Sequence, residues 1–162
     1  MPPTNEPPLT GAASVGRAVE RCRRDPRLLV ELADLLRRAE AAAAGWACRA
    51  CGECCRFEAF GHRLYVSAGE LALLIGSPPA APCEAGRCGY QVGPHCTARD
   101  RRPLGCRVFF CDAPAEQAEA VYEPLHRQIR DLHDRLDLPY LYVELSGALA
   151  ELFPPRGQPP PG

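Results

Sequence analysis

The stretch Cys48-Arg49-Ala50-Cys51-Gly52-Glu53-Cys54-Cys55 holds four of the ten cysteines in this chain of 162 residues. It contains two CxxC steps that share Cys51. A CxxC turn brings two sulfurs within reach of one metal, and its backbone N–H groups stabilise the thiolates. Gly52 suits such a turn, because glycine adopts a positive φ without strain. The stretch therefore predicts a thiolate metal centre.

The four cysteines do not complete a site by themselves. Cys54 and Cys55 are adjacent, so we expect their side chains to diverge toward two ions or toward opposite sides of one cluster. A bacterial ferredoxin run places its fourth cysteine four residues after the third, and this chain has none there. The missing ligand must come from later in the chain. The candidate metal ligands are Cys48, Cys51, Cys54, Cys55, Cys88, Cys96, Cys106 and Cys111.

The metal could be zinc or iron, and iron could be held in an iron–sulfur cluster. Four thiolates around Zn²⁺ leave a net charge of −2. Arg102 and Arg107 flank Cys106 and are candidates to offset that charge by hydrogen bonding. Cys83 ranks below the eight cysteines as an alternate ligand, and Cys22 reads as a small buried apolar residue.

Composition narrows the function classes. The formal net charge is −1, which argues against a nucleic-acid partner. No signal-peptide pattern and no long apolar run is visible, so we expect a cytoplasmic protein with no membrane partner. Thiols are kept reduced there, so ten cysteines favour metal binding over disulfides. The expected partner is a metal ion, and a protein partner is left open.

Hydrophobic periodicity predicts a mainly α fold with small irregular or β content. Helix 26–44 should begin at Asp25-Pro26 and end at Gly45, and its apolar face should pack against a second helix over 114–137. Pro124 should start a new helix or kink this one. Short strands are expected at 63–66 and 140–145, with a capping box from Ser67 to Glu70.

The remaining chain from Gly76 to Cys111 reads as loop, which a compact domain tolerates only if something other than a core orders it. We therefore expect a small metal-stabilised, cysteine-rich lobe packed on helices. The expected organisation is a Pro-rich disordered tail over 1–13, N-terminal helices over 14–45, the cysteine-cluster region over 46–112, a C-terminal helical region over 113–153, and a second disordered tail over 154–162.

The joint pattern resembles the YkgJ-type CxxCxxCC cysteine-cluster family of bacterial proteins. The residues that carry the resemblance span 46–111 and are Cys48, Cys51, Gly52, Cys54, Cys55, Arg87-Cys88, Cys96, Arg102-Pro103, Cys106-Arg107 and Cys111. The family usually has an aromatic residue where Arg99 stands. The resemblance implies a zinc- or iron-chelating domain without a defined reaction.

Two other functions remain open at this point. A metal- or iron–sulfur-dependent redox or protein-modifying enzyme would use a spare thiolate such as Cys55 or Cys111, and an open coordination position would mark it. A zinc-dependent nucleic-acid-binding module would use the local basic run around Arg99, Arg101, Arg102 and Arg107, although few aromatic residues are interleaved with it.

Overall fold

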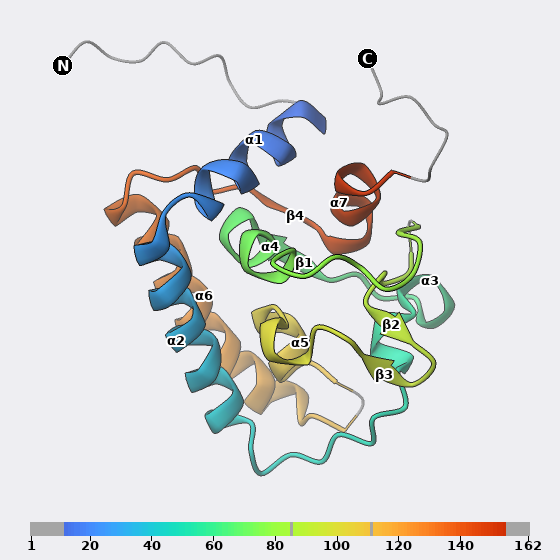
Figure 1. The fold of residues 1–162 in the computed structure, drawn as a ribbon. Coiled ribbons are helices and arrows are strands. Elements are labelled where there is room, and N and C mark those ends of the chain that lie inside the picture. Colours follow the sequence, from blue (N-terminus) through green and yellow to red (C-terminus); the bar gives the residue numbers. More distant parts are fainter. Residues whose placement is uncertain (1–11, 85, 111, 155–162) are drawn as a thin grey trace, which may run out of the picture.

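The chain is mainly helical in the computed structural model, which describes residues 12–84, 86–110 and 112–154 (Figure 1). Helix accounts for 56% of the described residues and strand for 7%, which confirms the mainly α prediction. The elements run in the order α1 (Ala12–Arg23), α2 (Pro26–Ala42), the 3₁₀ turn η1 (Glu53–Cys55), α3 (Phe57–Phe60), β1 (Tyr65–Ser67), α4 (Ala68–Leu74), β2 (Gln91–Val92), β3 (His95–Cys96), η2 (Arg99–Arg101), α5 (Leu104–Val108), α6 (Ala115–Arg135), β4 (Tyr142–Glu144) and α7 (Leu145–Leu152).

Both ends of α2 can be compared with the sequence prediction. Asp25 caps the start, since its carboxylate accepts a hydrogen bond from the Arg27 N–H at 2.9 Å, and Pro26 is the first helical residue. The end was predicted wrongly. The helix finishes at Ala42, and the capping residue is Ala43 with φ −92°, because the last turn tightens instead of using a left-handed Gly45.

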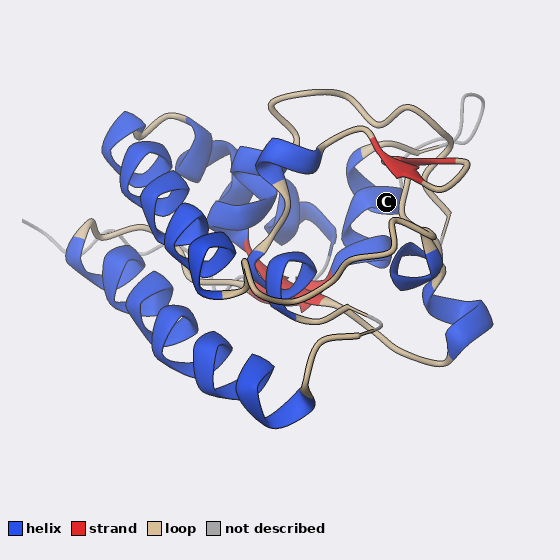
Figure 2. Cartoon of the chain, turned by 90° about the horizontal axis from the view of Figure 1, so that it is seen from below, coloured by secondary structure: helices blue, strands red, loops and turns tan. Residues whose placement is uncertain are grey.

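The two long helices, α2 and α6, pack against each other as predicted (Figures 1 and 2). They are antiparallel, because Arg135 of α6 pairs with Glu31 near the start of α2. Of the two alternatives for Pro124, a new helix start is wrong, since α6 continues through it, and a kink stays a prediction. Proline has no N–H, so the carbonyl four residues before Pro124 lacks its helical hydrogen bond. This face of α6 is exposed, so that carbonyl can bond to water instead.

Two small antiparallel sheets lie apart in the fold (Figures 1 and 2). In the first, β1 pairs with β4, so that Val66 stands opposite Val143. In the second, β2 and β3 form a hairpin. The segment after Gly76, predicted as loop, contains this hairpin, η2 and α5, and helix α7 was not predicted. These elements are short, and tertiary contacts rather than local propensity order them.

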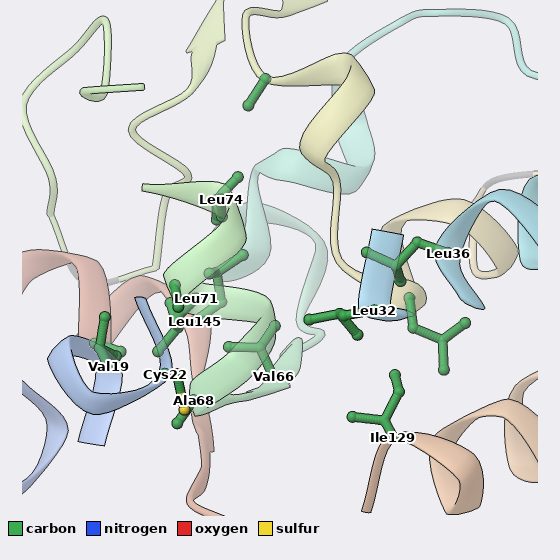
Figure 3. Close-up of a cluster of buried hydrophobic side chains, with 14 of the residues drawn as sticks. Val19, Cys22, Leu32, Leu36, Val66, Ala68, Leu71, Leu74, Ile129 and Leu145 are labelled. Carbon is green, nitrogen blue, oxygen red and sulfur yellow. The ribbon is translucent and has the colours of Figure 1, made fainter. Parts of the chain in front are cut away.

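Helix α4 lies at the centre of the core. Leu71, Ala68 and Leu74 of α4 meet residues from α1, α7 and β1 (Figure 3). Cys22 of α1 is fully buried among them, as the sequence predicted, and burial raises the pKa of its thiol to about 12. None of the described helices is long and apolar enough to cross a membrane.

A buried carboxylate joins α4 to α5. Ser67 and Glu70 form the predicted capping box, in which the Glu70 carboxylate accepts from the Ser67 N–H at 2.7 Å. Its other oxygen accepts from the Leu104 N–H, the first residue of α5, at 2.8 Å. Glu70 therefore fixes the start of two helices, and α5 carries Cys106.

His133 provides a pH prediction for the fold. It is fully buried, its Nδ1–H donates to the Pro139 carbonyl at 2.9 Å, and its Nε2 has no partner among the described residues. Burial lowers the pKa of this imidazole, because a second proton on Nε2 would meet no acceptor. Below about pH 6.5 the histidine takes up a proton in the unfolded chain but resists protonation in the folded chain. The free energy of unfolding should therefore decrease as the pH is lowered.

Urea denaturation at pH 7.5 and pH 5.5 measures this effect. Carboxylates also titrate in this range, so the comparison is between the wild-type chain and His133→Gln. The drop in unfolding free energy between the two pH values should be smaller in the variant. Equal drops would show that His133 does not contribute.

Candidate metal centre

Seven of the eight predicted cysteine ligands line one cavity of about 120 Å³. They come from four parts of the chain: the segment before η1, η1 itself, the loop and hairpin around β2 and β3, and α5. The eighth, Cys111, lies outside the described residues. The seven are Cys48, Cys51, Cys54, Cys55, Cys88, Cys96 and Cys106.

Five of these thiols form an inner set that interacts directly. Cys55 shares hydrogen bonds with both Cys54 and Cys88. Cys96 acts electrostatically on Cys55, and both Cys55 and Cys96 act electrostatically on Cys106. Cys54 and Cys55 both lie in the tight turn η1, and each thiol acts on the pKa of the other, while the expectation that their side chains diverge stays a prediction. We call Cys54, Cys55, Cys88, Cys96 and Cys106 the inner set.

Neighbouring thiols and burial together raise the pKa of three inner thiols. The hydrogen bond with Cys55, followed by burial, raises the pKa of Cys54. The bond with Cys54 lowers the pKa of Cys55, but the bond with Cys88 and burial outweigh it, and the net value is about 12. Burial and the neighbouring Cys55 raise the pKa of Cys106 well above its ordinary value. These thiols can ionise together only if a cation compensates them.

The two predicted arginines occupy different places. Arg102 lines the cavity, and its charge lowers the pKa of both Cys54 and Cys106. Arg107 does not line it. The Arg107 side chain is 3% exposed, is paired with Glu40, and donates to the carbonyls of Arg102 and Asp100, each at 2.8 Å. Arg107 therefore holds the loop on which Arg102 stands.

Cys48 and Cys51 differ from the inner set, because both are exposed. They lie on an extended segment that leads from α2 to η1 (Figure 1). Ala50, between them, has φ 51°, a left-handed conformation that a residue with a Cβ seldom adopts. The first CxxC step is thus an extended rim of the cavity, while the second, from Cys51 to Cys54, turns at Gly52 with φ 76°.

Two hydrogen bonds join the halves of the cysteine pattern. The Cys88 N–H donates to the Cys55 carbonyl at 3.0 Å. Gln91, which is 4% exposed, donates from Nε2 to the Gly52 carbonyl at 2.8 Å. Nothing in the sequence marked Gln91 as part of the site, since a single glutamine in a predicted loop carries no pattern.

Gly52 supports a prediction with a matched control. A Cβ at Gly52 would stand 2.4 Å from Gln91 Nε2, whereas a Cβ at Gly93, also at positive φ, would meet nothing within 4 Å. Both alanine variants carry the cost of a left-handed Ala, about 1–2 kcal/mol. Gly52→Ala should lose at least about 1 kcal/mol more of unfolding free energy than Gly93→Ala, because it also displaces Gln91. Urea denaturation of both variants measures the difference, and equal losses would contradict the clash.

Other cysteines and histidines lie at various distances from the centre. Cys83 is buried with its sulfur against Gly89 and does not line the cavity. His62 lies within 3.1 Å of the Cys54 carbonyl, and His95 lines the cavity. Trp46 contacts the cavity-lining Phe110, with ring centroids 6.2 Å apart, and so packs at the edge of the site.

The described side chains do not stand at ligand distances. Within residues 12–84, 86–110 and 112–154, no group of three or more His, Cys, Asp or Glu residues is placed so that it could hold a metal ion. No family model, curated protein or solved structure matches the chain.

Proposed function

We propose that this chain chelates zinc or iron, with iron held either as an ion or in an iron–sulfur cluster. The observation that carries the proposal is the inner set, five thiols from distant parts of the chain that line one cavity. The CxxCxxCC pattern and its resemblance to chelating proteins point the same way. The proposed role is structural or regulatory, in a reducing compartment such as the cytoplasm.

The chemistry of the donor set fits such a group. Four thiolates close a tetrahedral zinc site or hold an iron–sulfur cluster, and the inner set has one more than four. Thiol–thiol hydrogen bonds and burial raise the pKa of Cys54 and Cys55, and burial raises that of Cys106; a bound cation would favour the thiolate form of all three. Arg102 would offset part of the remaining negative charge. Cys48 and Cys51 would act as additional or exchanging ligands at the exposed rim.

The proposed structural role follows from how little regular structure orders residues 46–111. Among the described residues between α2 and α6 the elements are short, the longest being α4 with seven residues. Binding at the inner set would crosslink η1, the loop before β2, β3 and α5, which gives the metal-stabilised lobe expected from the sequence. A strong chelator should therefore increase proteolysis within 46–111, while α2 and α6 keep their far-UV signal.

Elemental analysis and a visible spectrum of anaerobically purified protein test the proposal. Zinc protein is colourless, whereas an iron–sulfur protein is brown. We expect at least one zinc or iron per chain. Protein that is purified without metal and that binds neither added Zn²⁺ nor Fe²⁺ under reducing conditions would disprove the proposal.

A further inference from the structure

Four of the five tyrosines gather in one cluster, and none of these four lines the cavity of the inner set. They come from β1, α6 and the segment that enters β4, and they are joined by Phe109, which follows α5. Ring centroids of neighbouring members are 4.8 to 6.4 Å apart. We define the aromatic cluster as Tyr65, Phe109, Tyr122, His126, Tyr140 and Tyr142.

The cluster leaves large apolar rings in water. Tyr65 and Tyr142 are each 40% exposed and Phe109 is 42% exposed, whereas the fifth tyrosine, Tyr90, is 1% exposed. Tyr65 and Tyr142 share one face of the small sheet, because Tyr142 pairs with Ser67, which lies two residues after Tyr65 on the same strand. Contiguous exposed aromatic rings are typical of binding surfaces, where tyrosine is enriched.

The hydrogen bonds within the cluster leave one hydroxyl donor unused. Tyr122 is 2.6 Å from the Tyr142 hydroxyl and 2.9 Å from His126 Nδ1, and His126 Nε2 is 2.6 Å from the Tyr140 hydroxyl. The three phenols and the neutral imidazole that make these contacts carry four donor hydrogens in total. The three contacts use only three of them. One hydroxyl hydrogen is therefore left for an acceptor outside the cluster.

A polyproline segment has the complementary chemistry. Its prolyl rings are apolar and stack on aromatic surfaces, and its backbone carbonyls make no internal hydrogen bonds, so they can accept from phenols. This chain carries such a segment immediately after α7, namely Pro154-Pro155-Arg156-Gly157-Gln158-Pro159-Pro160-Pro161. Residues 155–162 lie outside the described part of the chain.

The segment is attached close to the cluster. Helix α7 follows β4 directly, and β4 begins at Tyr142. From Tyr142 to Leu152 the chain spans at most about 22 Å, since three extended residues cover about 10 Å and eight helical residues about 12 Å. Eight residues would cover about 25 Å in a polyproline conformation, which is long enough to reach back to Tyr142.

The surroundings of the cluster and the proline-rich segment also carry opposite charges. Glu123 lies on α6 next to Tyr122 and acts electrostatically on Tyr142. It is exposed and forms no ion pair with any described residue. The proline-rich segment contains one charged residue, Arg156, which has the opposite sign.

We propose that the aromatic cluster binds the proline-rich C-terminal segment of its own chain, with prolyl rings against Tyr65 and Tyr142 and Arg156 near Glu123. The binding would leave the cluster covered in the resting protein and open to a competing proline-rich peptide. It does not depend on the metal centre.

Arg156 is also a trypsin site, which allows a test on the full chain. Trypsin releases the hexapeptide 157–162, and its rate follows the fraction of chains in which the segment is unbound. Tyr65→Ala/Tyr142→Ala should release this hexapeptide about tenfold faster than wild type, whereas Phe60→Ala, which removes an exposed ring outside the cluster, should not change the rate.

A second measurement needs no substitution. Excess unlabelled peptide with the sequence of residues 154–162 should accelerate release of the hexapeptide from isotope-labelled wild-type protein. Equal release rates in wild type and a folded double variant, or no effect of the peptide, would overturn the proposal.

Faster release on dilution would show that a second copy supplies the segment, and equal competition by a peptide of residues 1–9 would show that the cluster does not select the C-terminal segment. Either result would also overturn it.

Discussion

The double variant Cys55→Ala/Cys106→Ala is expected to lose most of its bound metal. It leaves three thiols in the inner set, one fewer than a closed zinc site or an iron–sulfur cluster requires. Loss of a residue that only orients a ligand already costs 10- to 100-fold in metal affinity, so loss of two ligands should cost at least about 100-fold. Competition with a chromophoric chelator, performed under reducing conditions on the purified variant, measures this change.

The matched control is Cys22→Ala/Cys83→Ala. Both of its cysteines are buried, and neither lines the cavity, so this variant removes the same atoms without removing a proposed ligand. It should lose stability because of the cavities that it creates, yet keep its metal content per folded chain. If both double variants lost metal equally, or if neither did, the inner set would not be the ligand set.

The variant Glu70→Ala is expected to lower the free energy of unfolding by about 3–5 kcal/mol. Its carboxylate is 4% exposed and accepts three hydrogen bonds, from the Ser67 N–H, the Ser67 hydroxyl at 2.8 Å and the Leu104 N–H. Removing it leaves buried donors without an acceptor, and each such donor costs about 1–3 kcal/mol. Urea denaturation measures the total.

Glu144→Ala is the control for the capping role alone. Glu144 caps α7, where it accepts from Ser146 N–H at 2.9 Å and Gly147 N–H at 2.7 Å, but it is only partly buried and contacts no second helix start. The loss there should be about 1 kcal/mol, as for an ordinary cap. Amide hydrogen exchange in α5 should rise in Glu70→Ala and not in Glu144→Ala. A loss in Glu70→Ala no larger than the control would refute the coupling of α4 to α5.

The local elements were predictable because their signals are local. Asp25-Pro26 begins α2, the Ser67–Glu70 box begins α4, and apolar spacing marks the long helices, since each of these contacts joins residues within one turn. Helix α7 was missed because it is short and its cap is a glutamate, and α5 because five residues give no periodic signal. The continuity of α6 through Pro124 could not be predicted, because it depends on whether Pro124 lies on the exposed face of the helix.

The sequence predicted the set of candidate cysteine ligands, but not which of them are buried and which are exposed. Spacing named the candidates, and only the packing of α5 and the β2–β3 hairpin against η1 separates a buried inner set from the exposed Cys48 and Cys51. Sequence order also could not show that Arg107 is buried against Glu40, or that Gln91 reaches Gly52. Each of these contacts joins residues far apart in the chain.

The sequence by itself therefore determined the helical character of this protein and the residue types of its candidate centre, because propensity, capping and cysteine spacing act over a few residues. The tertiary structure alone decided which thiols meet, which arginine faces them, and that four tyrosines share one surface. Such contacts depend on how distant segments pack, and the free energy of that packing is not encoded in any one of them.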